Sequence, residues 1–394
     1  MISIKQNKLK IWFPLYFYYP EPVGGMEKFA GILAGELSER GYQTRIISAK
    51  KSAKQNEQRQ MVTQPPFSVE KIYLPKFSPI PYYHYLFSLY LYLKKNYMNF
   101  DVLFASGMQS VSSAAIASAH SCMKKVILRV SSQTIQRHIK HIQESRVPFF
   151  AQWAIKRLRD ADCYVVMSSS IKNNLLEWGI ESKRIFCIPT GIDTSYWHPV
   201  EDKTAVRQKL GLSPESFLAI YVAMLRPEKD HSTLLKAWKK FSGTKPDAKL
   251  LLLGDGHEKM NIAAFIEKLG LKNSVILLGY SAEVLNYLQA ADVFVFSSQT
   301  EGSSNAILEA MACALPVIAS NIETNAEIIT DNLNGLLFPA GDHDLLFSKI
   351  NFISNNPALS KAFGEKARYD TEAIFSLKSC VDKYEEMINW VAFN

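Results

Sequence analysis

Cysteine is scarce in this 394-residue chain, and no segment is long and apolar enough to span a bilayer. The five cysteines are scattered, and neither a CxxC pair nor a metal-ligand spacing joins them, which argues against a zinc site and a disulfide framework. The longest apolar runs fall well short of the roughly 20 residues of a membrane-spanning helix. The aromatic stretch IWFPLYFYYP contains proline and precedes no small-residue cleavage site, so it does not resemble a signal peptide. These absences favour a cytoplasmic protein with reduced thiols.

Acidic residues are under-represented in the first half of the chain. Residues 1–195 hold 26 Lys and Arg against 13 Asp and Glu, whereas residues 196–394 hold 19 against 24, and the net charge is +8. A basic half suits an anionic membrane or a phosphate-bearing substrate. No recognition motif supports nucleic acid as the partner. An undirected surface imbalance is the remaining interpretation.

Strand-like and helix-like segments alternate along almost the whole chain. Short β-branched runs such as DVLFAS and KVILRV alternate with helical stretches, which is typical of a parallel, doubly wound sheet. The pattern restarts at FLAIYVAML, after a break near 193–215 that is rich in proline, charge and turn residues. We therefore predict an α/β protein with two Rossmann-like domains, 1–195 and 196–375, and a C-terminal helix over about 376–394 that packs back on the first domain. Because ligands of such sheets bind at the carboxyl ends of the strands, the two domains are expected to face one another across a cleft.

The segment EGSSNAILEAMACALPVIAS, residues 301–320, carries Glu301 and Glu309 on either side of a predicted helix start. Glu301 would lie in the loop after the strand DVFVFSS, where active-site groups collect. Ser303 and Ser304 are favourable N-cap residues, and the N–H groups and dipole at the start of the helix 305–313 would favour a phosphate. A carboxylate at 309 would accept hydrogen bonds from ribose hydroxyls, and one at 301 from a sugar ring. Two solvated glutamates, or an acid/base pair for glycoside hydrolysis, are the alternatives.

Further motifs occur in a consistent order, and together they resemble a retaining family-4 glycosyltransferase (glycosyl transferases group 1) of the GT-B architecture. PEPVGGMEKFA is similar to the family's Gly-Gly-x-Glu loop, LRPEKDH to its basic phosphate-binding segment, and Glu301 to Glu309 to its pair of glutamates separated by seven residues. The other matching stretches are ADCYVVMSSS, IPTGIDTSYWHP, LLLGDG, VILLGY and EIITDNLNGLLFPAGD. The resemblance covers nearly the whole chain and implies two Rossmann-like domains that face one another across a cleft.

The resemblance implies a role for each residue that matches a family motif. Lys229 would stabilise the negative charge that develops on the leaving diphosphate, with Arg226 assisting, and Glu301 would contact the donor sugar. It implies no metal and no other cofactor, since a cationic side chain and a helix dipole can replace Mg²⁺. The residues implied are Lys229, Glu301 and Arg226 for catalysis; Gly24, Gly25, Ser303, Ser304, Asn305 and Glu309 for donor binding; and Arg129 and Ser131 as candidates on the acceptor side.

The chain departs from the family pattern in two places. Ala223-Met224 stand where Gly-Arg is usual, and Arg226 is the candidate to replace that arginine. Many relatives carry a histidine after the strand that here reads KVILRV, whereas this chain continues Ser131-Ser132. The reaction attributed to the family is a same-face displacement in which the leaving phosphate helps to deprotonate the acceptor, so a protein base is not strictly required.

The segment PIPYYHYLFSLYLYLKK, residues 79–95, is apolar, rich in tyrosine and closed by lysines. It is expected to form a helix, since prolines start it and cations end it. One interpretation is a helix packed on the first domain. The other is a surface in the lipid interface, where tyrosine and lysine are favoured. Together with the basic half, the second interpretation predicts peripheral binding to the anionic cytoplasmic leaflet.

The sequence therefore predicts a retaining, metal-independent hexosyltransferase that uses a nucleotide-sugar donor, with UDP as the expected nucleotide. The acceptor would be a glycan or polyprenyl-linked, in the synthesis of a cell-surface polysaccharide, lipopolysaccharide or glycoconjugate, and the protein would be cytoplasmic and peripheral on the inner face of the membrane. Two alternatives stay open: a non-catalytic GT-B subunit, suggested by Met224 and the absent histidine, and a GT-B epimerase acting on a nucleotide sugar. A dinucleotide oxidoreductase is disfavoured, because GDGHEK lacks the third glycine of that fingerprint.

Overall fold

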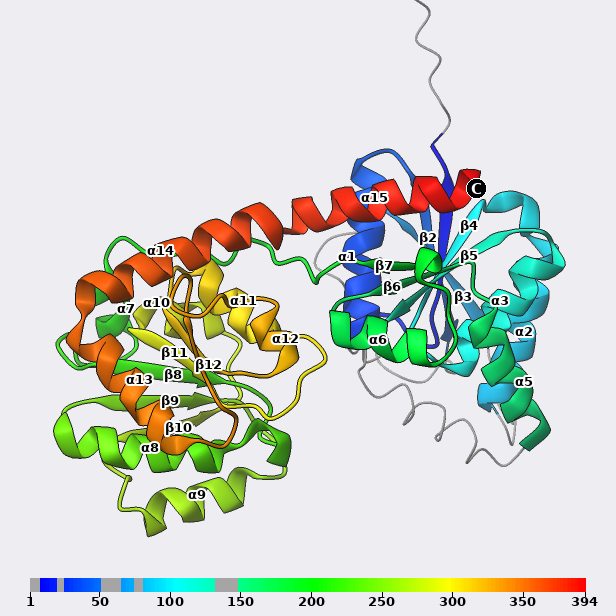
Figure 1. Cartoon of the computed structure of the whole chain (residues 1–394). Coiled ribbons are helices and arrows are strands. Elements are labelled where there is room, and N and C mark those ends of the chain that lie inside the picture. The colour runs from blue at the N-terminus through cyan, green and yellow to red at the C-terminus, as the bar shows by residue number, and fades with distance from the viewer. Residues whose placement is uncertain (1–7, 20–24, 51–64, 74–80, 132–147) are drawn as a thin grey trace, which may run out of the picture. The chain divides into compact units, whose positions relative to one another are not determined.

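The computed structural model describes residues 8–19, 25–50, 65–73, 81–131 and 148–394, and the chain divides into two compact units. The first unit comprises the chain up to Pro189 together with Val381–Asn394, and the second comprises Thr190–Cys380. Each unit contains one sheet whose strands pair in parallel, with helices packed on it (Figure 1). The predicted class, two doubly wound parallel-sheet α/β units, is confirmed. The boundary that the contacts define, Pro189/Thr190, precedes the predicted one at 195/196.

The first unit is a seven-stranded sheet in the order β3-β2-β1-β4-β5-β6-β7. Its helices bury apolar residues at helical spacing, as α1 does with Ala30, Leu33, Ala34 and Leu37. Helices α2, α3 and α5 lie together on one side of the sheet, and α1 lies on the other (Figure 1). The elements are β1 (Lys10–Pro14), α1 (Gly25–Glu39), β2 (Gln43–Lys50), β3 (Ser68–Tyr73), α2 (Pro81–Lys95), β4 (Val102–Ser106), α3 (Ser110–Ser121), β5 (Lys125–Val130), α5 (Pro148–Arg159), β6 (Cys163–Val166), α6 (Ser169–Glu177) and β7 (Ile185–Cys187).

The last helix of the chain, α15 (Leu377–Phe393), ends in the first unit. Its residues from Val381 onward bury Tyr384 and Ile388 in that unit. The Glu385 carboxylate accepts hydrogen bonds from Arg40 at 2.9 Å and from the Tyr42 hydroxyl at 2.9 Å. These contacts attach the C-terminal helix to α1 and to the start of β2.

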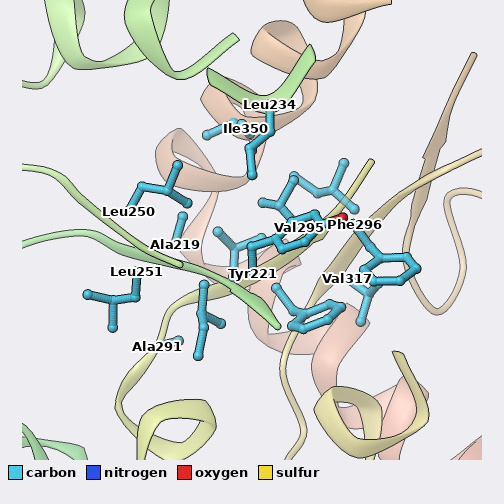
Figure 2. Packing of buried hydrophobic residues seen from close by; sticks show 14 of the residues in the cluster. Ala219, Tyr221, Leu234, Leu250, Leu251, Ala291, Val295, Phe296, Val317 and Ile350 are labelled. Carbon is cyan, nitrogen blue, oxygen red and sulfur yellow. The ribbon is translucent and has the colours of Figure 1, made fainter. Parts of the chain in front are cut away.

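The second unit is a six-stranded sheet in the order β10-β9-β8-β11-β12-β13. Figure 2 shows its core, in which the rings of Tyr221 and Phe296 stack at 5.5 Å among aliphatic side chains. The elements are α7 (Lys203–Lys209), β8 (Leu218–Val222), α8 (His231–Thr244), β9 (Lys249–Leu253), α9 (Lys259–Lys268), β10 (Val275–Gly279), α10 (Val284–Ala290), β11 (Val293–Phe296), α11 (Asn305–Ala312), β12 (Val317–Ser320), α12 (Glu323–Ala326), β13 (Leu336–Phe338), α13 (His343–Asn355) and α14 (Pro357–Ile374).

Several element bounds differ from those expected from sequence. The strand expected over 217–225 ends at Val222, because the chain then turns into a loop that crosses the glycines after β9. The helix expected over 305–313 ends at Ala312. Strands β3 and β13 lie at sheet edges and are not predicted, since SVEKIY and LLF carry no extended apolar run. Within the described ranges, no helix combines the length and the apolar character needed to cross a membrane.

The glycines of LLLGDG allow close approach between two backbone segments. A Cβ atom on Gly254 would lie 1.7 Å from the carbonyl oxygen of Ala223, and one on Gly256 would lie 2.3 Å from that of Leu225. Gly254 also has φ +143°, which side-chain-bearing residues rarely adopt. The motif therefore packs the loop after β9 against the loop after β8.

Replacing Gly254 by alanine is expected to destabilise the second unit by about 3 kcal/mol, because the methyl group would force two backbones apart. Gly243→Ala is the matched control. Gly243 lies exposed in α8 with open space around its Cβ position. Alanine there is expected to increase the free energy of unfolding by at most about 1 kcal/mol. Urea unfolding of both variants measures the difference. Equal stability of Gly254→Ala and the wild type would contradict the packing argument.

Candidate functional site in the second unit

The candidate site lies where the strand order of the second sheet changes direction. Strands β8 and β11 are parallel neighbours, with β9 on the far side of β8 and β12 on the far side of β11. The loops that follow β8 and β11 therefore diverge from the same edge, which is where open α/β sheets bind ligands. These loops hold residues 223–230 and 297–304.

Side-chain hydroxyls of the loop after β11 donate hydrogen bonds to backbone carbonyl oxygens of the loop after β8. The Ser297 hydroxyl donates to the carbonyl oxygens of Lys229 at 3.2 Å and Asp230 at 2.9 Å. The Ser298 hydroxyl donates to the carbonyl oxygen of Glu228 at 3.1 Å. The Tyr221 hydroxyl, which rises from β8, donates to the same Lys229 carbonyl at 2.6 Å. These bonds fix the short 3₁₀ turn Pro227–Lys229 and so the point from which the Lys229 side chain starts.

Lys229 and Glu301 form an ion pair at the carboxyl ends of β8 and β11. The Lys229 Nζ atom lies 2.5 Å from Glu301 Oε1, and the two side chains are 16% and 9% exposed. Nζ also lies 5.5 Å from the centre of the Phe296 ring. The structure thus brings together two of the three residues predicted to be catalytic. The buried carboxylate beside it restricts the rotamers of the lysine.

The start of α11 differs from the expected capping. Ser304 occupies the N-cap position, but its hydroxyl donates to Asn325 Oδ1 at 2.6 Å instead of accepting a backbone N–H. The Ser303 hydroxyl donates to Asn305 Oδ1 at 2.9 Å and lies 3.0 Å from that of Thr190. Ser304 therefore stands at the N-cap position, as its residue type favoured, but it does not cap the helix through its side chain. The helix has eight residues and no acidic residue in its first turn. The helix dipole therefore still gives its N-terminal end a partial positive charge, beside these serines.

Glu309 lies on α11, behind the helix start. It is partly buried, and desolvation raises the pKa of its carboxyl group to about 7. The neighbouring Cys313 thiol, also buried, has a pKa raised to about 12. Near neutral pH Glu309 therefore exchanges between a neutral acid and an acceptor-only carboxylate.

His231, the first residue of α8, was not selected from the sequence. It is buried, its ring lies 5.0 Å from that of Tyr221, and burial lowers its pKa to about 4. Asp230 precedes it with φ +46° and caps α8 by accepting from the Thr233 N–H. Asp230 and His231 directly follow Lys229 and connect the 227–229 turn to α8. The hydrogen-bonding residues Tyr221, Ser297 and Ser298 were also missed; small polar residues at the end of a β-strand are the signal that points to the serines.

The Arg226 side chain pairs with a different carboxylate from the one that Lys229 contacts. Its guanidinium is half-exposed, 3.9 Å from Glu228, and lines a hollow with residues of α8 and α9. Met224 is 54% exposed. The Arg226 carbonyl accepts from the Lys229 backbone N–H at 3.1 Å, but among the described residues no hydrogen bond or ion pair joins the Arg226 guanidinium to Lys229 or Glu301, so its predicted catalytic role stays a prediction.

The predicted residues of the first unit are placed differently from one another. Gly24 lies outside the described residues, and Gly25 is the first residue of α1, with open space at its Cβ position. Arg129, near the end of β5, is buried; its guanidinium stacks 3.7 Å from the centre of the Phe29 ring, and its Nε donates to the Tyr384 hydroxyl at 3.4 Å. Ser131, half-buried, follows β5. Arg129 thus packs inside its unit, against the C-terminal helix.

Two family models match the two halves of the chain. The family described as Glycosyl transferases group 1 matches residues 202–370, and Glycosyltransferase Family 4 matches residues 23–196. N-acetyl-alpha-D-glucosaminyl L-malate synthase of Bacillus anthracis is 25% identical over 96% of both chains. The UDP-Gal:alpha-D-GlcNAc-diphosphoundecaprenol alpha-1,3-galactosyltransferase of Escherichia coli is 30% identical over 53% of this chain and 54% of its own.

Solved structures share the fold. HepE of Anabaena, in complex with UDP, superposes with a TM-score of 0.79 at 18% identity, over 97% of this chain and all of that one. The predicted family and the GT-B fold are both confirmed. The chain is a glycosyltransferase, and it belongs to the group 1 glycosyltransferases with a family 4 N-terminal domain.

Proposed function

We propose that this enzyme transfers a sugar from a UDP-linked donor to a lipid-linked or glycan acceptor, with retention of anomeric configuration and without a metal ion. The observation that carries the proposal is the Lys229–Glu301 pair at the strand-order change, next to the start of α11. A fixed cation and a positive helix end are what a departing diphosphate requires.

In the proposed reaction, the bond between the anomeric carbon and the diphosphate oxygen breaks, and a bond from that carbon to the acceptor oxygen forms on the same face. The proton of the acceptor hydroxyl passes to the departing phosphate. The Lys229 ammonium stabilises the phosphate charge as it develops, which lowers the barrier because that charge is larger in the transition state than in the bound donor. Glu301 orients Lys229 and accepts from the sugar hydroxyls.

Donor and acceptor are assigned to different units. The donor is assigned to the second unit, where Ser303, Ser304 and Asn305 surround the helix start and Glu309 is available to ribose hydroxyls. The acceptor is assigned to the basic first unit. The diphosphoundecaprenol-linked sugar in the name of the Escherichia coli relative supports a lipid-linked acceptor. The basic composition of the first half of the chain suits binding at the inner face of the cytoplasmic membrane.

A panel of nucleotide sugars tests the proposal. UDP-sugars, GDP-mannose and ADP-glucose would be screened for thermal stabilisation of the protein and for slow donor hydrolysis, each with and without EDTA. One UDP-sugar is expected to stabilise the protein and to be consumed equally with EDTA present. NMR of the sugar released or transferred would give the anomeric configuration. Absence of binding by every nucleotide sugar would overturn the proposal, and isomerisation of the donor without transfer would indicate an epimerase.

A further inference from the structure

A large hollow in the first unit lies outside the candidate site, and one of its walls is formed by α2, within the tyrosine-rich segment 79–95. It has a volume of about 810 Å³ and lies over α3, between α2 and α5. Small residues, including Ala117, form its floor, and aromatic side chains of the flanking helices, among them Tyr83, Tyr90, Phe150 and Trp153, form its walls. The rings of Tyr83 and Phe150 meet edge to face at 5.2 Å. The volume is that of a small-molecule pocket, and the lining is that of an apolar one.

The helices around this hollow are basic. None of α2, α3 and α5 contains Asp or Glu. Lys94 and Lys95 close α2, and the last turn of α5 carries Lys156, Arg157 and Arg159. Arg157 lines the hollow and is paired with Asp160, which follows the helix, at 3.1 Å. Its Nε atom is nevertheless buried without a hydrogen-bond partner among the described residues.

The rim of the hollow exposes apolar surface next to these cations. Phe87, on the wall formed by α2, is 63% exposed, and Leu91 one turn later is 47% exposed. Lys94 and Lys95 follow on the same exposed side of the helix. Exposed aromatic and aliphatic side chains beside lysines are typical of surfaces that lie at a lipid interface.

We infer that this hollow binds one hydrocarbon chain of an anionic lipid, with the phosphate of the lipid held by the cations of α2 and α5. An apolar hollow beside cations, in helices that carry no acid, is complementary to a phosphate group joined to a hydrocarbon tail. The inference goes beyond the proposed function: the last turns of α2 and α5 lead into the amino ends of β4 and β6, whereas sugar transfer is expected at the carboxyl ends of the strands. Its test measures binding alone and needs neither donor nor transfer.

The first experiment compares soluble alkyl phosphates, used below their micelle concentration, by isothermal titration calorimetry with the full-length protein. Affinity is expected to increase roughly fourfold for each methylene added between octyl and dodecyl phosphate, from the usual free energy of burying one methylene. Dodecyltrimethylammonium, which has the same tail and the opposite charge, is expected to bind at least about tenfold more weakly. Inorganic phosphate measures the contribution of the head group alone.

Two kinds of variant separate the tail from the charge. Ala117→Phe fills the floor of the hollow and is expected to weaken dodecyl phosphate binding by at least about tenfold. Phe87→Glu changes an exposed lining residue of the hollow and is also expected to weaken binding of the alkyl chain. It replaces Ala117→Phe in the test if that variant does not fold. Lys94→Glu/Lys95→Glu is expected to weaken binding chiefly at low salt, whereas the equal charge change Lys239→Glu/Lys268→Glu, on the second unit, is expected to leave it unchanged.

Three results would overturn the inference. The first is equal affinity for inorganic phosphate and dodecyl phosphate, and the second is unchanged binding in a folded Ala117→Phe and in Phe87→Glu. The third is a dimer in light scattering that Ala117→Phe dissociates, since a second copy of the chain would then occupy the hollow. Donor binding measured on Ala117→Phe keeps this test distinct from the proposed function, because the nucleotide-sugar site lies in the other unit.

Discussion

Replacing Lys229 by alanine is expected to lower the rate of sugar transfer by about 10²–10³-fold, with a smaller effect on donor affinity. The reason is that its ammonium group acts on charge that is largest in the transition state. The same change should destabilise the second unit by about 3 kcal/mol, because it leaves the buried carboxylate of Glu301 without its partner. Turnover assays and urea unfolding measure the two effects.

The double variant Lys229→Ala/Glu301→Gln separates these effects. A neutral amide removes the uncompensated charge, so most of the lost stability is expected to return while the transfer rate stays low. Lys259→Ala is the matched control, since Lys259 pairs with Asp255 in the same unit with both side chains exposed, and its loss should cost less than about 1 kcal/mol. Full activity of Lys229→Ala would remove the lysine from the proposed mechanism.

Replacing Glu309 by glutamine is expected to stabilise the protein at alkaline pH while it weakens the donor complex. The pKa of Glu309 is raised from 4.5 to about 7, so the folded state binds a proton more tightly than the unfolded state. The stabilising contribution is therefore complete below pH 4.5 and is lost as the pH rises from 4.5 through about 7. The difference corresponds to about 3 kcal/mol, so Glu309→Gln should be more stable than the wild type at pH 8 and similar to it at pH 4.

Donor binding by the wild type should show the opposite trend with pH. Only the carboxylate form of Glu309 accepts two ribose hydroxyls, so the affinity for a UDP-sugar is expected to fall about tenfold per pH unit below about 7. The Glu309→Gln variant should bind the donor weakly at every pH. Glu215→Gln, at an exposed position of the same unit, is the control for the loss of one negative charge. A wild-type affinity that does not change between pH 5 and 8 would argue against ribose binding by Glu309.

Local patterns were sufficient to predict the alternation of strands and helices in both units and the placement of Lys229 and Glu301 after two neighbouring strands. Lys229 and Glu301 follow strands that read clearly as apolar runs, so their position at a sheet edge could be inferred without tertiary information. Strands β3 and β13 could not be predicted in this way, because edge strands need little apolar surface. The contact between Ser304 and Asn325 joins residues of separate elements, and no sequence spacing indicates it.

Two other features also depended on tertiary structure. The burial that raises the pKa of Glu309 comes from the packing of α11, which contacts α14. Arg129 lies near the end of β5, where a ligand-binding residue would be expected, yet it packs against the ring of Phe29 and the hydroxyl of Tyr384. The burial of Glu309 and that of Arg129 both depend on elements that are distant in sequence. The residues adjacent to them in sequence do not indicate which elements these are.

The hydrogen bonds that hold the 227–229 turn have a consequence for how this enzyme can diverge. Tyr221, Ser297 and Ser298 bond to carbonyl oxygens that every amino acid possesses. The position of the turn is therefore independent of which side chains it and the preceding loop carry, and those of Met224 and Arg226 are about half exposed. Residues 223 and 224 can therefore differ from the family's usual Gly-Arg while Lys229 keeps its place beside Glu301.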